Sequence, residues 1–229
     1  MTINVHDAAV AFGQELQDLL DAVLPVRWNT NPEDRRVQVS ASANNRSVIR
    51  LAERRGRVEL FRNGGAPRRA HAVEYWCTHD TKHDFLAVQK SAFELYSSTD
   101  KTPLIRLDYL RNAHTVPSAH WNVHAERGAV SALLARTNSD HAGLVSKLHL
   151  TVGGSRMRPC LEDFIEMIAQ EFRFDLKNDA AKILKDGRES WRRKQIRALV
   201  RDGRHPERAC IVCWWVTGSS VRAGSAVPS

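Results

Sequence analysis

Histidines and other polar residues alternate with apolar residues in two short segments of the chain. In the segment 119–126, an extended strand would place Trp121, Val123 and Ala125 on one face. The opposite face would carry four polar residues, His120, Asn122, His124 and Glu126. In the segment 147–152, the same alternation groups Lys147, His149 and Thr151. If the two strands pair with these faces aligned, one surface carries three histidines.

The spacing of these histidines limits the chemistry that they could share. His120 and His124 would lie roughly 13 Å apart along a strand, at about 3.3 Å per residue, so they cannot serve one reacting centre. A working pair must therefore combine His149 with either His120 or His124 across neighbouring strands. Two such histidines suit general acid and general base catalysis on a phosphodiester. A divalent metal held by His120 with Asn122, or by His124 with Glu126, and completed by His149, is the alternative use. A solvent-facing sheet with no catalytic role is the simplest interpretation.

A glycine-rich segment with two arginines follows the second histidine strand. Gly153 to Arg158 connects this strand to a helix that is predicted to begin at Pro159. Arg156 and Arg158 would then lie beside a helix N-terminus, an arrangement that favours anions. An ordinary strand-to-helix turn with exposed arginines explains the same sequence.

The tripeptide His149-Leu-Thr151 resembles one half of the signature of the two-histidine phosphoesterases. That family carries a His-x-Ser/Thr motif on each of two strands. The matching half in this chain would be His120-Trp-Asn122, in which asparagine replaces the hydroxyl residue. The resemblance covers only the tripeptide His149-Leu-Thr151, and the two segments are closer together in the chain than is usual in that family. It implies a phosphoesterase activity that uses the two histidines.

Positive charge is concentrated toward the C-terminus. The segment 188–208 is rich in arginine, and helical spacing predicts one basic stripe formed by Arg193, Arg197, Arg201 and Arg204. Such a stripe could follow a nucleic-acid backbone, with binding that weakens steeply as salt rises. It could equally face solvent, or bind an acidic protein partner.

Composition sets the class of protein. The 229 residues are 42% hydrophobic, and Lys and Arg outnumber Asp and Glu by 34 to 26, for a net charge of +8. These values exclude a disordered, collagen-like or coiled-coil chain and favour a polyanionic partner, although the arginine excess would also follow from a GC-rich coding sequence.

No apolar run is long enough to span a bilayer and no export signal is evident, so we expect a cytoplasmic protein without a membrane partner. Cys210 and Cys213 form a lone CxxC with no second pair close in sequence, so we expect reduced thiols and no zinc.

The elements that must position these residues define an α+β fold. Apolar spacing predicts an N-terminal helix from about residue 5 to 23, capped by Asn4 and ended by Pro25. Alternation then predicts a mainly antiparallel sheet of six to eight strands, built as a run of hairpins. Short strands are expected at 37–40, 48–51, 58–61, 72–78, 85–96, 104–110, 119–125 and 147–152. A helix at 159–172 should pack on one face of this sheet, and a short helix is expected at 128–136.

The C-terminal part is predicted to differ from this core. Residues 1–174 should form the core domain, and 175–216 a basic helical extension, interrupted at Gly187, with a terminal strand at 210–216. The Ser/Gly/Ala-rich residues 217–229 should be a disordered tail. The leading functional hypothesis is a metal-independent phosphodiesterase or ribonuclease-like protein. A toxin or a phage-defence effector is the biological role that we associate with this hypothesis. His149 would pair with His120 or His124, Asn122 and Thr151 would orient the phosphate, and Arg156 and Arg158 would stabilise negative charge. The alternative is a non-enzymatic nucleic-acid-binding or adaptor protein, or a subunit of a larger complex.

Overall fold

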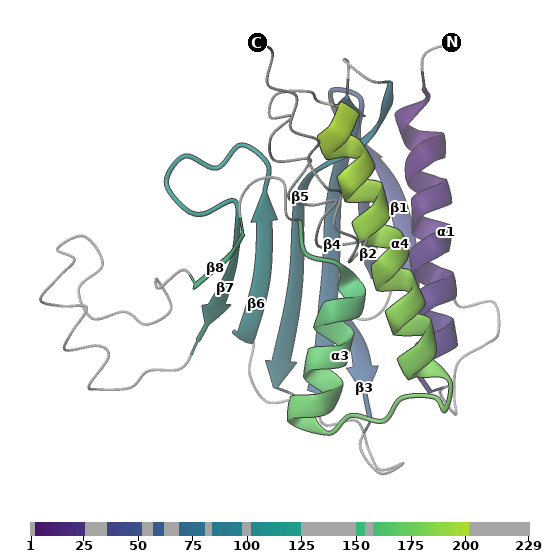
Figure 1. The fold of residues 1–229 in the computed structure, drawn as a ribbon, viewed down its shortest axis with the longest axis vertical. Helices are drawn as coiled ribbons and strands as arrows, with labels where there is room; N and C mark the ends of the chain where they lie inside the picture. The colour runs from purple at the N-terminus through teal and green to yellow at the C-terminus, as the bar shows by residue number, and fades with distance from the viewer. Residues whose placement is uncertain are drawn as a thin grey trace, which may run out of the picture. The chain divides into compact units, whose positions relative to one another are not determined.

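The computed structural model describes most of the predicted core. The described residues are 3–25, 36–51, 57–61, 69–80, 84–97, 102–124, 150–153 and 158–201. The predicted helix at 128–136, the strand at 210–216 and the tail at 217–229 lie outside these ranges, as do His149, Arg156 and Arg204. Figure 1 shows helices covering one face of a sheet, which confirms the predicted α+β class.

Helix α1 spans Val5–Val23 and is held at both ends by side chains. The Asn4 side chain accepts hydrogen bonds from the backbone N–H groups of His6 and Asp7, as predicted. At the other end, the Arg36 guanidinium donates to the carbonyl oxygens of Leu20 and Pro25, at 3.3 and 3.0 Å. The Leu20 carbonyl also accepts from the backbone N–H of Leu24, so Arg36 adds a second donor there and ties the end of α1 to the residue that follows it, Pro25.

Eight strands form one antiparallel sheet in the order β1-β2-β4-β5-β6-β7-β8, with β3 paired to β4. Their bounds are β1 Val37–Ser42, β2 Arg46–Leu51, β3 Arg57–Leu60, β4 Arg69–Asp80, β5 Phe85–Ser97, β6 Pro103–Leu110, β7 Ala119–Val123 and β8 Leu150–Gly153. The predicted number of strands and their antiparallel pairing are confirmed. The β1–β2 turn uses Asn44 and Asn45 at positive φ, a conformation that asparagine tolerates better than most residues.

One predicted hairpin is wrong, because β2 and β3 do not pair with each other. Both pair with β4, β3 along Arg69 to Ala72 and β2 along Glu74 to Cys77. Strand β4 has 12 residues and is therefore roughly 40 Å long, so one of its edges accommodates two short strands end to end. Local alternation predicts each strand but carries no information about which neighbour it selects.

Helix α3 spans Leu161–Phe172, and helix α4 spans Ala180–Arg201. Helix α4 runs through Gly187, where the sequence predicted an interruption. A Cβ atom at Gly187 would lie 2.7 Å from the Glu162 Oε1 atom of α3. A side chain at position 187 would therefore meet the Glu162 side chain, and the glycine does not mark a break in the helix.

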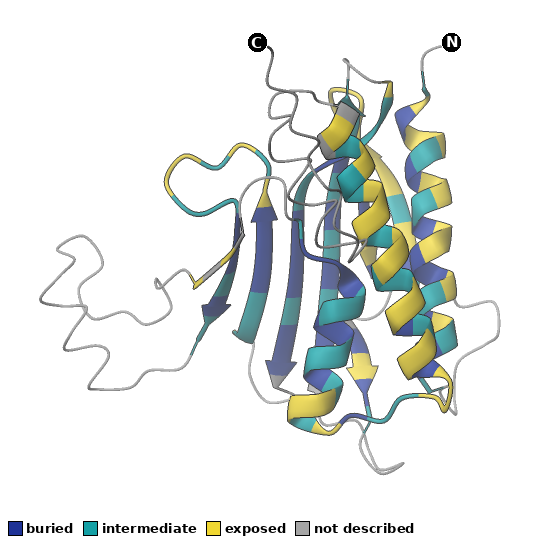
Figure 2. Ribbon diagram, viewed as in Figure 1, coloured by how far each residue is buried: buried dark blue, intermediate teal, exposed yellow. Residues whose placement is uncertain are grey.

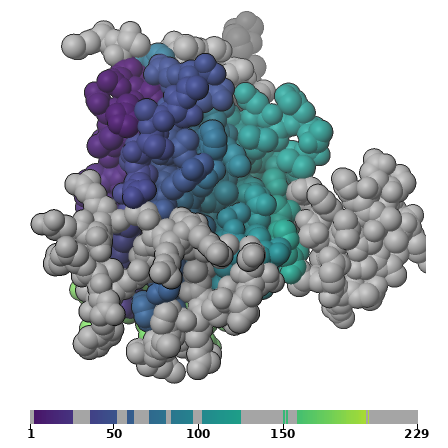
Figure 3. Space-filling view, turned by 180° about the vertical axis from the view of Figure 1, so that it is seen from behind, coloured from purple at the N-terminus to yellow at the C-terminus, as the bar shows by residue number. Residues whose placement is uncertain are grey.

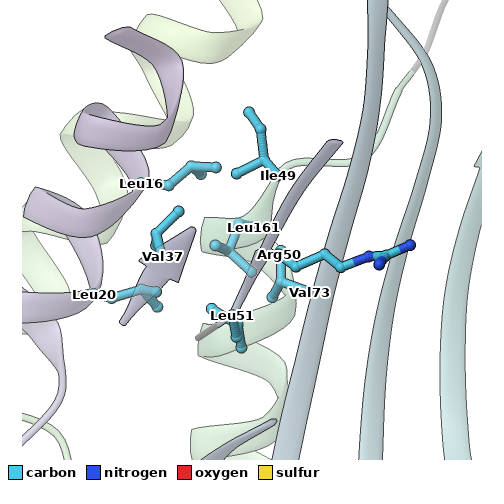
Figure 4. Close-up of a pocket in the computed structure, with 8 residues that line it drawn as sticks. All are labelled: Leu16, Leu20, Val37, Ile49, Arg50, Leu51, Val73 and Leu161. Atoms are coloured by element: carbon cyan, nitrogen blue, oxygen red, sulfur yellow. The ribbon is translucent and has the colours of Figure 1, made fainter. Parts of the chain in front are cut away.

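The hydrophobic core lies between the sheet and the helices, as the burial colours in Figure 2 show. Phe164 of α3 packs against Phe93 and stacks on Trp121, with ring centroids 5.7 and 6.1 Å apart. Figure 4 shows a second part of this core, where apolar side chains of α1, β1, β2, β4 and α3 converge and Arg50 points away from them. The space between these side chains has no room for a water-sized molecule.

The chain divides into two compact units, Met1–Arg188 and Glu189–Ser229. The first unit extends beyond residue 174, where the sequence suggested a boundary, because Ala180 and Leu184 of α4 belong to the core. Among the described helices, none is long and apolar enough to cross a membrane.

Candidate functional site on the polar face of the sheet

The strands of the sheet present apolar side chains on one face and polar side chains on the other. The apolar row Val73, Phe93, Leu107 and Trp121 belongs to the core or packs against it. Because side chains alternate along each strand, the residues next to these lie on the opposite face. Figure 3 shows the molecule from this side, with β1 and β2 in blue beside α1 and the strands β5 to β7 in teal.

Two adjacent rows of cross-strand partners make up this polar face. One row crosses six strands through Arg50, Glu74, Ala92, Asp108, His120 and Thr151. The next row contains Ala72, Glu94, Arg106 and Asn122. Residues from β4 to β8 that are far apart in sequence therefore meet on one surface.

Three polar residues of these rows are buried together. Asp108, His120 and Asn122 are only 9%, 5% and 6% exposed. The Asn122 Nδ2 atom donates to Asp108 Oδ2 at 3.0 Å, and the His120 Nε2 atom lies 4.0 Å from the same oxygen. We call these three residues the Asp108 cluster.

The Pro117 carbonyl fixes the tautomer of His120. The His120 Nδ1 atom lies 2.6 Å from the carbonyl oxygen of Pro117, which can only accept a hydrogen bond. Nδ1 must therefore carry a proton, and in the neutral imidazole Nε2 is the basic nitrogen. The basic atom of His120 thus lies on the side of the ring that faces Asp108.

Arg106 connects the Asp108 cluster to a second carboxylate. Its guanidinium donates to Asp108 Oδ1 at 3.1 Å and forms an ion pair with Glu94 Oε1, also at 3.1 Å. The Tyr96 hydroxyl in turn donates to Glu94 Oε2 at 2.7 Å. One guanidinium is therefore shared by two carboxylates, so these charged groups together carry no excess positive charge.

A separate polar group lies further along the same face. Arg50 forms an ion pair with Glu74 at 2.8 Å, and Trp76 also donates to Glu74. The Arg50 guanidinium lies 5.9 Å from the centre of the Trp76 ring, within range of a cation–π contact. The charged groups of Arg50 and Glu74 are therefore already paired with each other, which reduces their capacity to bind a ligand.

The structure brings some of the sequence-predicted residues together. Strands β7 and β8 are neighbours, and His120 is paired in register with Thr151. His124 follows the end of β7, and its backbone N–H donates to the Leu104 carbonyl at 2.9 Å. His149 precedes β8 and lies outside the described residues, so the second histidine of the predicted pair is not placed.

Arg158 lies on the other side of the sheet. Its guanidinium is 6.0 Å from the centre of the Tyr109 ring. Tyr109 neighbours Asp108 on β6, so its side chain points to the opposite face of the sheet. Burial lowers the pKa of Arg158, and Tyr75, another residue of the core face, partly offsets this effect. Arg158 and His120 are therefore separated by the sheet.

The predicted basic stripe falls in the second unit. Arg193 and Arg197 lie on α4 and are exposed, and Arg193 forms an ion pair with Glu189 at 3.6 Å. Arg201 is the last residue of α4. Arg192 and Lys194 are also exposed there, so the basic surface is broader than the predicted stripe.

Sequence reasoning missed Glu94, Arg106 and Asp108. The signal was present, because Arg106 and Asp108 alternate with apolar residues in β6 as His120 and Asn122 do in β7. Among the described residues, no cluster of histidine, cysteine and carboxylate side chains has the arrangement of a metal site. Cys77 and Cys160 are buried and not bonded to each other.

The chain was compared with protein-family models, with curated proteins and with solved structures. None of the three comparisons finds a match.

Proposed function

We propose that this protein is a phosphodiesterase of the ribonuclease type, which acts on nucleic acid or a nucleotide and uses a histidine pair as general acid and base. The observation that supports it is the placement of His120. Its basic Nε2 atom lies beside a buried carboxylate, in register with Asp108 on one side and Thr151 on the other. A base held in one tautomer within a polar network is the arrangement that general base catalysis requires.

The burial of the Asp108 cluster adds to this support. Taking a carboxylate and an imidazole out of water is unfavourable unless both are well paired. Hydrophobic residues at positions 108, 120 and 122 would serve folding at least as well. Buried ionisable groups that lie beside one another are therefore candidates for a functional site.

The two histidines would take opposite roles. His120 removes a proton from the attacking hydroxyl or water as its oxygen forms a bond to phosphorus. The bond from phosphorus to the leaving oxygen breaks, and His149 gives its proton to that oxygen. Arg156, in the segment before α3, would stabilise the charge on the phosphate. The proposed chemistry needs no metal, and a toxin or defence role would fit such an activity.

A panel of phosphodiesters tests the proposal. Purified protein is incubated with end-labelled RNA, single-stranded DNA and cyclic nucleotides, in EDTA and separately with Mn²⁺ or Zn²⁺. We expect cleavage in EDTA. No cleavage of any of these substrates under any of these conditions would overturn the phosphodiesterase proposal. Cleavage only with metal would overturn the metal-independent mechanism.

A second candidate function is nucleic-acid binding without catalysis, and the exposed cations of α4 favour it. The segment Glu189–Arg201 contains five basic residues and one acidic residue, a net charge of +4. Replacement of Arg193, Arg197 and Arg201 by alanine should then reduce the slope of log affinity against log salt by roughly 2 to 3. The exposed Lys182 and Lys185, changed together to alanine, provide the control within α4.

The slope of log affinity against log salt distinguishes nucleic-acid binding by α4 from the binding of an acidic protein partner. An unchanged slope in the triple arginine variant would exclude the α4 surface as the nucleic-acid contact. An acidic protein that co-purifies with the wild-type chain and is lost from the same variant would assign the surface to a protein partner.

A further inference from the structure

The side-chain amide of Asn122 has one possible orientation. Its nearest partner is the Asp108 carboxylate, which as an anion only accepts hydrogen bonds. The amide nitrogen must therefore face Asp108, since the reverse orientation would place two acceptor oxygens against each other. The Oδ1 atom of Asn122 consequently points away from Asp108.

This oxygen is buried and has no hydrogen-bond partner among the described residues. Asn122 as a whole is only 6% exposed. A buried acceptor without a partner destabilises the folded state, and native proteins contain few of them. The Nε2 atom of His124, two residues further along the chain, is also buried and has no partner within the described part. Two residues that are two positions apart in sequence thus each have a polar atom without the partner that a bound molecule could supply.

The groups around Asn122 Oδ1 define what such a molecule must offer. An amide oxygen accepts hydrogen bonds and repels the oxygens of a phosphate. Arg106 is already shared between Asp108 and Glu94, so it does not reverse this preference. This part of the site therefore favours a neutral N–H or O–H donor over an anion.

We infer that the Asn122 carbonyl accepts a hydrogen bond from an uncharged donor of the substrate, either a ribose 2′-hydroxyl or the exocyclic amino group of a base. This inference rests on the proposed function, and it assigns Asn122 to the sugar or base instead of to the phosphate. A 2′-hydroxyl bound here would distinguish RNA from DNA. An amino group bound here would distinguish cytosine or adenine from uracil.

Three nucleotides that the proposed activity cannot cleave test the inference on the wild-type protein. Cytidine 3′-monophosphate carries both donors, 2′-O-methylcytidine 3′-monophosphate lacks the hydroxyl donor, and uridine 3′-monophosphate lacks the amino group. Their dissociation constants are measured by calorimetry. We expect one of the two changes to weaken binding roughly five- to twelvefold, which is the effect of one hydrogen bond. The change that weakens binding identifies the donor.

A variant then assigns the effect to Asn122. In Asn122→Leu, which has a similar volume, the nucleotide that bound more weakly to the wild type should bind as well as cytidine 3′-monophosphate. Tyr96→Phe removes a hydrogen bond from the outer end of the same network and should retain the difference. Thermal unfolding shows whether each variant is folded.

Equal binding of the three nucleotides by the wild type would overturn the inference. A trapped water molecule would then be the hydrogen-bond donor to Asn122 Oδ1. If RNA is nevertheless cleaved, the proposed function survives this result. If RNA is not cleaved and none of the three nucleotides binds at millimolar concentration, both proposals fail. A difference that persists in Asn122→Leu would show that another residue recognises the donor.

Discussion

Asp108 and His120 are cross-strand partners on β6 and β7, with the carboxylate Oδ2 and the imidazole Nε2 4.0 Å apart. Both residues are buried on the sheet face opposite the hydrophobic core, in a row that continues to Thr151 on β8. Antiparallel pairing thus places a carboxylate next to a histidine whose tautomer is fixed by a backbone carbonyl. Each of these contacts predicts an effect that can be measured.

Removing the charge of Asp108 should destabilise the fold. Asp108→Asn weakens the contact with Arg106 and places an amide against the amide of Asn122. We expect the free energy of unfolding to fall by about 1 to 3 kcal/mol, because the buried groups of Arg106 and Asn122 lose the charged partner that offsets their removal from water. Urea denaturation measures this free energy. Asp18→Asn, on the exposed surface of α1, should change stability by less than about 0.5 kcal/mol. If the two variants lower the free energy of unfolding equally, the Asp108 carboxylate contributes no more to stability than an exposed carboxylate does.

Arg188 should be the main polar connection between α3 and α4. It contacts both Asp163 and Glu166, and its side chain is only 15% exposed. Arg188→Met keeps most of the aliphatic volume but leaves two carboxylates without their cation, so we expect a loss of about 1 to 3 kcal/mol. Arg193→Met removes an ion pair from a side chain that is 72% exposed, and should have almost no effect. Differential scanning calorimetry of both variants provides the comparison, and similar melting temperatures would contradict it.

Gly187 should be intolerant of a methyl group only while Glu162 is present. Alanine is favoured over glycine inside a helix by about 1 kcal/mol, yet its Cβ atom would meet Glu162 Oε1. We therefore expect Gly187→Ala to destabilise the wild type and to stabilise the Glu162→Ala variant. A double-mutant cycle measured by urea unfolding tests this change of sign. An additive result would mean that the Glu162 side chain moves aside without penalty.

Stability should fall at alkaline pH because of Cys77. Burial raises the pKa of this thiol to about 12 in the folded protein, from its ordinary value of 9.0. The folded state therefore retains a proton that the unfolded chain loses, so the contribution is complete below about pH 9 and is lost as the pH rises toward 12. Urea unfolding between pH 8 and 11 should show this decline, and Cys77→Val should show a weaker one. Identical pH profiles would contradict the prediction.

The sequence predicted the elements well because each depends on local pattern. Asn4 and Pro25 bracket α1, and alternation locates the strands. Pairing is not local, so the association of β2 and β3 with the two halves of β4 was missed. Gly187 was misread for a related reason, since the Glu162 side chain that lies against it is distant in sequence.

The candidate site was predictable in part. The alternation around His120 and Thr151 suggested two neighbouring strands, and β7 and β8 are neighbours with these two residues as cross-strand partners. Leu150 and Val152, which flank Thr151, are exposed and do not face the core as the alternation in β8 would predict. The contribution of Asp108 required knowledge that β6 lies beside β7 in that register. The position of Arg158 could not follow from its closeness in sequence to Thr151, because side chains from one connecting segment can reach either face of a sheet.

The most direct test of the central claim compares two histidine variants in the cleavage of labelled RNA. His120→Gln removes the proposed general base. His114→Gln changes an exposed histidine in the connection between β6 and β7. If His120 is the base, kcat/KM should fall by about 100- to 10,000-fold in His120→Gln and remain at the wild-type value in His114→Gln. A folded His120→Gln protein that cleaves RNA at the wild-type rate would contradict the claim.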